Sequence, residues 1–243
     1  MRVFESQATA AAAVVDEIVA VLMACRAQHR RPVLALPTGG TPVAIYGELL
    51  RRQSEGLELQ DLVSFNLDEF LDLPDGHPGS YRAWMRGHFH GPAGIAPAAA
   101  HFPDAATAPA DYEAAIARAG GLDMAVLGIG GNGHVAFNEP GSAPDSRTRE
   151  VRIEESSRRA NAGLFASLEE VPARARTMGI ATLLDARALR MVAFGAAKAE
   201  IVRRALEEPP TPEVPASLLR GHRDFRCFLD AAAASRLGGA KAG

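Results

Sequence analysis

The chain of 243 residues carries 29 acidic and 26 basic side chains, a formal net charge of −3, and is 47% hydrophobic. This length suits one large α/β domain with a well-buried core. Because Lys and Arg form no long run and only 6% of residues are aromatic, the sequence indicates no nucleic-acid surface. The two cysteines, Cys25 and Cys227, lie far apart without metal-ligand spacing, so we expect buried, reduced thiols in a cytoplasmic protein.

The apolar segment from Ala8 to Cys25 predicts an amphipathic helix near the start of the chain. Glu5 precedes it and the adjacent acids Asp16 and Glu17 interrupt it, which is not typical of the apolar part of a secretory signal. No run reaches the roughly 18 apolar residues that a membrane span needs. We therefore expect neither a signal segment nor a membrane anchor.

Beyond that helix, short apolar runs alternate with helical patterns, and no internal repeat or second domain is indicated. The predicted strands are Val33–Leu36, Leu62–Asn66, Asp123–Gly128, Thr177–Ile180, Met191–Phe194 and Phe225–Leu229. The predicted helices are Pro42–Gln53 with Thr41 as N-cap, Ser80–His88 with Ser80 as cap, Asp111–Ala119 and Lys198–Glu207. A long connection covers 91–109, and we expect a frayed tail over 238–243. This alternation predicts a single α/β domain over residues 1–243 with a mainly parallel sheet.

The segment from Leu36 to Pro42 joins a predicted strand to a predicted helix. Its two glycines and two threonines can direct backbone N–H groups and hydroxyls at an anion, and the helix N-terminus adds a favourable dipole. It lacks the Gly-Lys-Ser/Thr ending of a Walker loop. We favour a phosphate cradle formed by Thr38, Gly39, Gly40 and Thr41 over a plain strand-to-helix turn.

Carboxylates follow the next predicted strand, at Asp68, Glu69 and Asp72. One of them could face a pocket as a general base. A solvated strand end with acids that cap a helix explains the same pattern equally well, so this segment alone does not decide between the two.

The segment from Gly128 to Pro140 concentrates four glycines, two asparagines, one histidine and one carboxylate after an apolar strand. Ligands bind at the carboxyl ends of strands in open α/β sheets, and His134 has Glu139 nearby to orient it, so we favour a proton-transfer role for His134. A metal site fits poorly, because no cysteine or second histidine accompanies the pair. His88 and His90 are interpreted as surface residues.

Five motifs in order resemble the glucosamine-6-phosphate deaminase family, within the wider group that includes 6-phosphogluconolactonase. They are LPTGGTP (36–42), FNLDEF (65–70), HPGSY (77–81), GNGHVAFNEPGS (131–142) and TMGIATLLDA (177–186). The resemblance covers about residues 33–207, and the Phe-Asn-Glu-Pro run at 137–140 is the deaminase pattern rather than the lactonase pattern. It implies a modified Rossmann-like fold, with a lid over about 152–174, and no metal or organic cofactor.

The resemblance also implies a reaction, the conversion of glucosamine 6-phosphate and water to fructose 6-phosphate and ammonia. Within it, His134 opens the sugar ring, Asp68 moves the proton from C2 to C1, and Asn132 and Glu139 orient His134. The phosphate is expected on Thr38, Gly39, Gly40, Thr41 and Lys198. A galactosamine 6-phosphate deaminase and a 6-phosphogluconolactonase-type hydrolase are alternatives, and a non-catalytic sugar-phosphate sensor is a third.

Three positions depart from the family pattern. Asn132 stands where many members have Asp, which predicts a different pH dependence. Gly163 occupies the place of a phosphate-binding Arg on the lid, and Arg158 and Arg159 are candidate substitutes. Val151 replaces a Lys of the effector site in longer members, so we expect a monomer or small homo-oligomer without an allosteric switch.

Overall fold

The computed structural model describes residues 1–238, so that the tail predicted to fray falls outside the described residues beyond Gly238. Within this part of the chain, seven strands form one sheet in the order β1-β10-β9-β6-β2-β3-β5, and all neighbouring pairs are parallel. The mainly parallel α/β fold predicted from the sequence is therefore confirmed. The strands are β1 (Arg2–Phe4), β2 (Val33–Leu36), β3 (Val63–Asn66), β5 (Ala100–His101), β6 (Met124–Gly128), β9 (Leu189–Ala193) and β10 (Phe225–Asp230).

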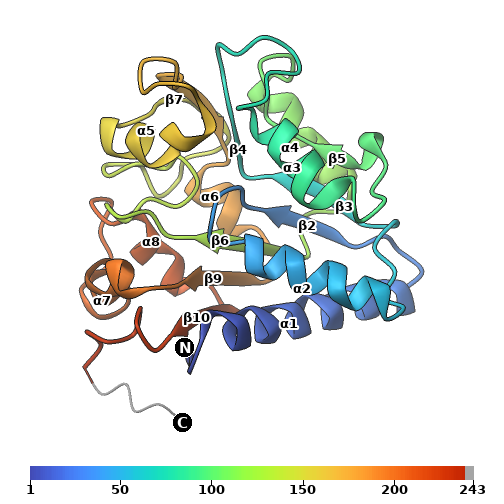
Figure 1. Cartoon of the computed structure of the whole chain (residues 1–243), viewed down its shortest axis with the longest axis horizontal. Helices are drawn as coiled ribbons and strands as arrows, with labels where there is room; N and C mark the ends of the chain where they lie inside the picture. The colour runs from blue at the N-terminus through green and yellow to red at the C-terminus, as the bar shows by residue number, and fades with distance from the viewer. Residues whose placement is uncertain (239–243) are drawn as a thin grey trace.

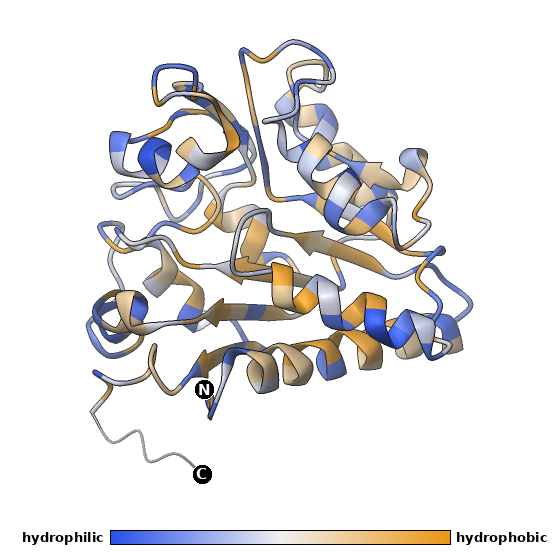
Figure 2. Cartoon of the chain, in the orientation of Figure 1, coloured by the Kyte–Doolittle hydropathy of each residue, from blue (hydrophilic) through white to orange (hydrophobic). Residues whose placement is uncertain are grey.

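Helices cover both faces of this sheet (Figure 1). Successive side chains of a strand point to opposite faces, so Leu34 and Leu36 of β2 pack with the residues of α1 and α2, while Val33 and Ala35 join the core on the other face. Figure 2 shows the hydrophobic residues concentrated in the central strands. The helices are α1 (Gln7–Ala27), α2 (Val43–Ser54), α3 (Tyr81–Met85), α4 (Pro109–Arg118), α5 (Glu155–Asn161), α6 (Ile180–Leu184), α7 (Ala199–Glu207) and α8 (Pro215–Leu218).

Helix α1 is the helix predicted near the N-terminus, but it is apolar on most sides rather than amphipathic. Its first turn is closed by a capping box between Ser6 and Thr9. By length and composition alone α1 could cross a membrane, but 44% of its apolar window is buried inside the protein. Val14, Ile18 and Leu22 recur at helical spacing and are buried in the core with β2. Packing on the sheet thus accounts for the apolar character of α1.

The strand order reverses direction between β2 and β6. From β2 the chain proceeds through β3 and β5 toward one edge, whereas β6, β9 and β10 lie successively toward the other. The loops that leave the carboxyl ends of β2 and β6 therefore diverge, which leaves a crevice between them. Open α/β sheets bind their ligands in such a crevice.

A second, antiparallel sheet stands above this crevice and was not predicted from the sequence. It contains β4 (Asp68–Phe70), β8 (Arg174–Thr177) and β7 (Arg149–Arg152), in the order β4-β8-β7. Figure 1 shows α5 beside β7 at the upper left. Because β4 begins at Asp68, directly after the core strand β3, the chain passes from one sheet to the other at the edge of the crevice.

The predicted strand from Thr177 to Ile180 is wrong. The strand ends at Thr177, and α6 begins at Ile180. A Cβ atom on Gly179 would lie 2.1 Å from the carbonyl oxygen of Ser146, so a crossing backbone segment occupies the space beside this residue. Met178 and Ile180 are apolar because they enter the main core, not because they continue a strand.

Local predictions had mixed outcomes. Ser80 caps α3 as expected, since its hydroxyl accepts a hydrogen bond from the Ala83 N–H at 3.1 Å. Thr41 does not cap α2, because the helix begins at Val43 and Pro42 occupies the N-cap position without a side-chain bond. The helix predicted to reach His88 ends at Met85 and continues as a π-helical turn, Arg86–His90.

The two histidines of that turn differ. His88 is exposed, as predicted. His90 is buried, contrary to the prediction, because the π-helical turn directs it inward to a hydrogen bond of 2.9 Å with the Ser64 hydroxyl. Burial lowers its pKa to about 4. Cys25 and Cys227 are free and buried, as expected.

Candidate active site

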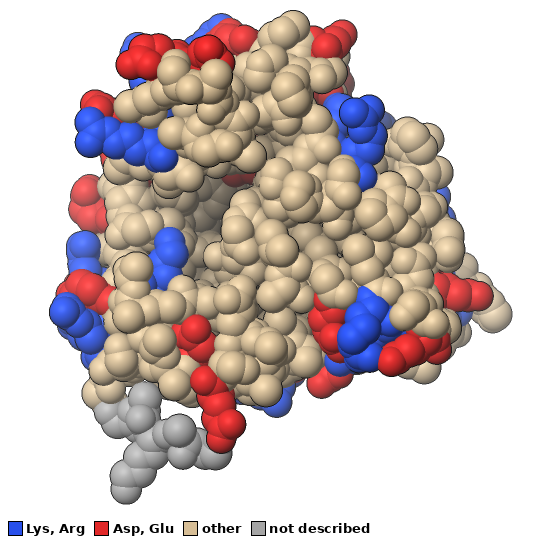
Figure 3. Space-filling view, in the orientation of Figure 1, with Lys and Arg blue, Asp and Glu red and all other residues tan. Residues whose placement is uncertain are grey.

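A cleft of about 590 Å³ lies at the carboxyl ends of β2 and β6, in the crevice that the strand order creates. Figure 3 shows it as a hollow in this face, with an acidic side chain in its depth. The loops after β2 and β6, the start of β4, one side of α5 and the residue before α7 line it. The predicted site residues that border it are Thr38, Gly40, Thr41, Asp68, Asn132, His134 and Lys198.

Glycines allow the loop after β6 to fold tightly around His134. The imidazole lies over Gly130, where a Cβ atom would stand 2.1 Å from the ring. Gly133 has φ of +93°, which non-glycine residues rarely adopt, and a Cβ atom there would lie 2.9 Å from Val214. Two of the predicted glycines are thus needed because side chains and backbone approach closely.

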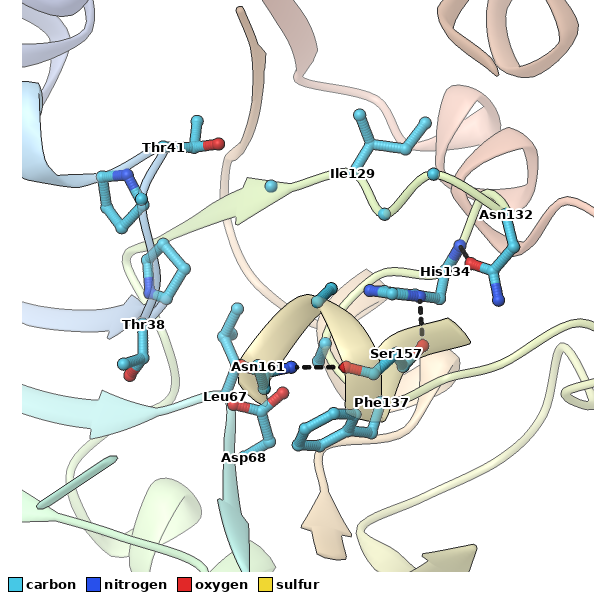
Figure 4. A pocket seen from close by; sticks show the side chains of 18 of the residues that line it. Thr38, Thr41, Leu67, Asp68, Ile129, Asn132, His134, Phe137, Ser157 and Asn161 are labelled. Atoms are coloured by element: carbon cyan, nitrogen blue, oxygen red, sulfur yellow. Dashed lines mark hydrogen bonds between the residues drawn. The ribbon is translucent and has the colours of Figure 1, made fainter. Parts of the chain in front are cut away.

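His134 presents its two ring nitrogens to different surroundings (Figure 4). Nδ1 lies 3.2 Å from the Ser157 hydroxyl and 3.4 Å from Oε2 of Glu139. Nε2 points toward the open part of the cleft. A histidine held at Nδ1 by an acceptor keeps its Nε2 lone pair for proton transfer.

Glu139 lies behind His134 and does not border the cleft itself. Burial alone would raise the pKa of its carboxyl, but hydrogen bonds from His134, Ser157 and Asn132 outweigh burial and lower it. Glu139 is therefore an ionised acceptor beside the imidazole.

Asn132 contacts this group differently from the expectation. Its amide oxygen accepts a bond of 3.1 Å from the backbone N–H of His134, not from the ring. Its amide nitrogen donates to Glu139 at 2.8 Å and to Glu154 at 3.3 Å. Asn132 thus orients the loop and the carboxylate, and reaches the imidazole only through Glu139.

Asp68 begins β4 and is 6% exposed, with its carboxylate directed into the cleft (Figure 4). Within residues 1–238, no Lys or Arg forms an ion pair with it. Burial, and secondly the charge of Glu69, raises the pKa of Asp68 well above its usual value. A carboxyl group with a raised pKa suits general base catalysis near neutral pH.

Glu69, the second acid of the motif, binds backbone N–H groups and does not border the cleft. Its carboxylate accepts hydrogen bonds from the backbone N–H groups of Phe70, Tyr81 and Arg82, at 2.8–2.9 Å. It therefore joins β4 to the first turn of α3. Asp72 pairs with Arg174 at the surface.

The predicted phosphate residues lie around the opposite part of the cleft. Thr38, Gly40 and Thr41 border it, whereas Gly39 does not, although its φ of +117° shapes the turn. Lys198 reaches the same cleft, and its ammonium donates a bond of 2.8 Å to the Ile129 carbonyl. Burial lowers the pKa of Lys198.

The sequence did not identify three polar residues of the cleft. Tyr81 donates a hydrogen bond of 2.9 Å from its hydroxyl to Asn161, which joins α3 to α5 across the cleft. Ser157, also on α5, contacts His134. Tyr81 stands in a motif that the resemblance uses, but Ser157 is 23 residues from His134 and no spacing pattern connects them.

Gly163 and the candidate substitutes for a lid arginine do not border the cleft in this conformation. The guanidinium of Arg158 donates to the carbonyls of Leu168 and Val171, at 2.7–3.1 Å. Arg159 pairs with Glu155 on the exposed side of α5. A Cβ atom on Gly163 would meet nothing within 4 Å, so the position has room for a side chain.

Metal binding has no evident basis in the described ranges, 1–238. No group of three or more His, Cys, Asp or Glu side chains lies close enough together to hold an ion there.

Comparisons of sequence connect the chain to known proteins. A family model described as "Glucosamine-6-phosphate isomerases/6-phosphogluconolactonase" matches residues 5–227. The chain is 45% identical to the glucosamine-6-phosphate deaminase of Rhodopirellula baltica over 217 residues, which cover 86% of each protein. It is 45% identical to the glucosamine-6-phosphate deaminase of Pseudarthrobacter chlorophenolicus over 216 residues, which cover 86% of this chain and 83% of that protein.

Solved structures agree with this relationship. The fold is similar to that of a monomeric glucosamine-6-phosphate deaminase, with a TM-score of 0.90 and 34% identity over 97% of this chain and 100% of that chain. The 6-phosphogluconolactonase of Leishmania guyanensis shares the fold alone, with a TM-score of 0.77 and 20% identity over 99% of this chain and 98% of that chain. The chain therefore belongs to the glucosamine-6-phosphate isomerase/6-phosphogluconolactonase family.

Proposed function

We propose that this protein is a glucosamine-6-phosphate deaminase, which converts glucosamine 6-phosphate and water to fructose 6-phosphate and ammonia. The relatives of this name at 45% identity support the assignment. The observation that carries it is the pairing of two proton-transfer groups in one cleft: His134, with Nε2 free, and Asp68, a buried carboxyl with a raised pKa.

His134 is the group we assign to ring opening. The step requires a proton to move from the anomeric hydroxyl to the ring oxygen of the sugar. Nε2 faces the cleft and can accept and return that proton, while Glu139 stabilises the imidazolium that forms in between.

Asp68 is the group we assign to the isomerisation itself. The open-chain sugar must lose a proton from C2 and regain it at C1, which leaves an imine at C2. Water then adds to C2 and ammonia leaves, which gives the ketose. One carboxylate over the chain can carry the proton between the two carbons. Positioned transfers of this kind contribute about 10²–10⁴-fold each.

The loop after β2 is our candidate for the phosphate site. Backbone N–H groups and hydroxyls over Thr38, Gly39, Gly40 and Thr41 supply hydrogen-bond donors, and Lys198 supplies a positive charge. Gly39 would act through its backbone, because its φ of +117° directs the turn.

The segment 152–174 is our candidate for a lid. It contains α5, whose inner side borders the cleft, and it returns to the small sheet at β8. Movement of α5 would change access to His134 and Asp68 together. We further propose a cytoplasmic monomer or small homo-oligomer; the free buried cysteines and the monomeric relative support this.

The test is release of both products from glucosamine 6-phosphate. We expect ammonia and fructose 6-phosphate in equal amounts, without added metal. Galactosamine 6-phosphate and 6-phosphogluconolactone are run in parallel, and turnover of either one without turnover of glucosamine 6-phosphate would refute the substrate assignment.

A further inference from the structure

Ser157 is a polar residue of α5 that the proposed mechanism does not use. It is 1% exposed, and its hydroxyl lies 3.2 Å from Nδ1 of His134. Oε2 of Glu139 lies 3.4 Å from the same nitrogen. Nδ1 of His134 thus has two oxygen neighbours, the buried hydroxyl of Ser157 and the carboxylate of Glu139.

The direction of these hydrogen bonds follows from the donors available. Oε2 of ionised Glu139 lies 3.4 Å from Nδ1 of His134 and can only accept, so Nδ1 carries the proton. The Ser157 oxygen, 3.2 Å from the same nitrogen, is the second acceptor for Nδ1–H. Nε2 therefore keeps its lone pair on the side of the cleft.

We propose that Ser157 is a positioning residue that, together with Glu139, holds His134 in the tautomer with the proton on Nδ1. Ser157 acts through His134 and has no contact with the reacting atoms in this role. The kinetic part of this inference rests on the proposed deaminase function, whereas the tautomer does not depend on it.

The contact between Ser157 and His134 joins two different elements of the chain. Ser157 belongs to α5, while His134 belongs to the loop after β6. Asn161, one turn further along α5, donates to the Ser157 carbonyl at 2.9 Å and accepts from Tyr81 at 2.9 Å. The position of α5 is thereby coupled to the state of His134, because displacement of α5 would remove one of the two acceptors of Nδ1–H.

Other charged groups near His134 also affect the pH dependence of kcat. The substitutions at Ser157 leave these groups unchanged. Glu139 contacts Nδ1, and Glu154 reaches the group through Asn132. Asp68 lies across the cleft and Lys198 lies at the loop after β6.

The test compares Ser157→Ala with Ser157→Thr, because threonine keeps a hydroxyl at the same atom. For Ser157→Ala we expect kcat to fall about tenfold, the value of one hydrogen bond to an ionic group, with a shifted pH profile. For Ser157→Thr we expect recovery to within about threefold. Glu155→Ala, on the exposed side of the same helix and outside the cleft, controls for alanine in α5 and is expected to keep the parent pH profile.

Nitrogen-15 NMR of labelled histidine gives a direct readout, with the His134 signals assigned by comparison with His134→Gln. The parent protein should show a protonated Nδ1 and an unprotonated Nε2 at high pH. Ser157→Ala should show a mixture of the two tautomers. An unchanged tautomer in Ser157→Ala overturns the inference, even if the protein lacks deaminase activity.

Fold integrity is checked separately by the melting temperature of each variant. If Ser157→Ala unfolds, Ser157→Thr and Ser157→Cys still vary the bond within a folded protein. A parent pH profile and parent tautomer in Ser157→Cys, which replaces the hydroxyl by a weak donor, would then contradict the inference.

Discussion

Buried charged side chains are paired at the amino end of the central sheet, whereas Asp68 at the carboxyl end has no cationic partner among the described residues. At the amino end, Asp123 is paired with Arg30 at 2.7 Å and with Arg187 at 2.8 Å. Arg190, 3% exposed at its side chain, pairs with Glu17 and Asp224, at 2.9 and 3.1 Å. At the carboxyl end, Asp68 has no such partner in the described chain. Unpaired buried charge is costly for folding, so its occurrence at one end marks the place where reactivity matters more than stability.

Asp68→Asn tests the carboxyl end and has the largest expected effect. An amide cannot accept the C2 proton, so we expect kcat for ammonia release to fall at least about 100-fold. At neutral pH the melting temperature should equal or exceed that of the parent, because a carboxyl with a raised pKa costs folding free energy once it ionises. This stability difference should vanish as pH falls and Asp68 becomes protonated.

Binding of fructose 6-phosphate, measured by calorimetry, separates chemistry from binding in this variant. We expect a Kd within about threefold of the parent, because the phosphate contacts are unchanged. Turnover near the parent rate would remove Asp68 from the role of base.

Asp123→Asn tests the amino end and should give the converse result. We expect a loss of about 2 kcal/mol in the free energy of unfolding, since Arg30, Arg187 and the Val33 N–H lose an ionic partner. Burial alone would raise the pKa of Asp123, but hydrogen bonds from Arg30, the Val33 N–H and Cys25 outweigh burial and lower it. The stabilisation is therefore present at neutral pH and lost as pH falls through the lowered pKa.

Urea unfolding at two pH values measures this difference. The kcat of the folded fraction should stay at the parent value, because Asp123 lies at the end of the sheet away from the cleft. A large drop in kcat without loss of stability would contradict the division between the two ends.

The same two ends explain how much could be predicted from the sequence. Periodicity predicts the strands β2 and β6, and their glycine-rich ends place Thr38 and His134 at one edge of a parallel sheet. The small antiparallel sheet escaped prediction because its strands are short and pair across distant segments, as Asp68 does with Thr177. Apolar residues at 178 and 180 resemble a strand, yet they are apolar because they enter the core before α6.

The site could be predicted only in part, for the same reason. His134 and Glu139 are close in sequence, and Asp68 lies in a motif, so pattern and resemblance find them. Ser157 and the pairing of Tyr81 with Asn161 depend on how α5 packs over the cleft. Gly39 does not border the cleft, and its φ of +117° shapes the turn between Thr38 and Gly40, which do.

Asn132→Asp adds a negative charge at the carboxyl end of the sheet, next to Glu139 and His134. The new carboxylate would replace an amide that donates to Glu139 at 2.8 Å, so this hydrogen bond is lost and a second negative charge stands beside His134. The added negative charge also stabilises the His134 imidazolium, so we expect the acid limb of kcat/KM to move to higher pH by about one unit. Asn132→Ser, which adds no charge, is the control. An acid limb that moves to lower pH would disprove the arrangement.

Glu69→Gln gives the smallest expected effect, because it changes a neighbour of the base. The charge of Glu69 is the second cause, after burial, that raises the pKa of Asp68. Without that charge the pKa of Asp68 should fall, so the acid limb of kcat/KM should move to lower pH by about half a unit. The variant also loses one acceptor for the N–H groups of Tyr81 and Arg82, so we expect a lower melting temperature. The pH profile is a separate readout from the melting temperature. Glu55→Gln, a control at a side chain that is 61% exposed, should leave that profile at the parent value. An acid limb unchanged by Glu69→Gln would mean that burial alone raises the pKa of Asp68. Exclusion of water from the cleft, and not the neighbouring charge of Glu69, would then set the pKa of the proposed base.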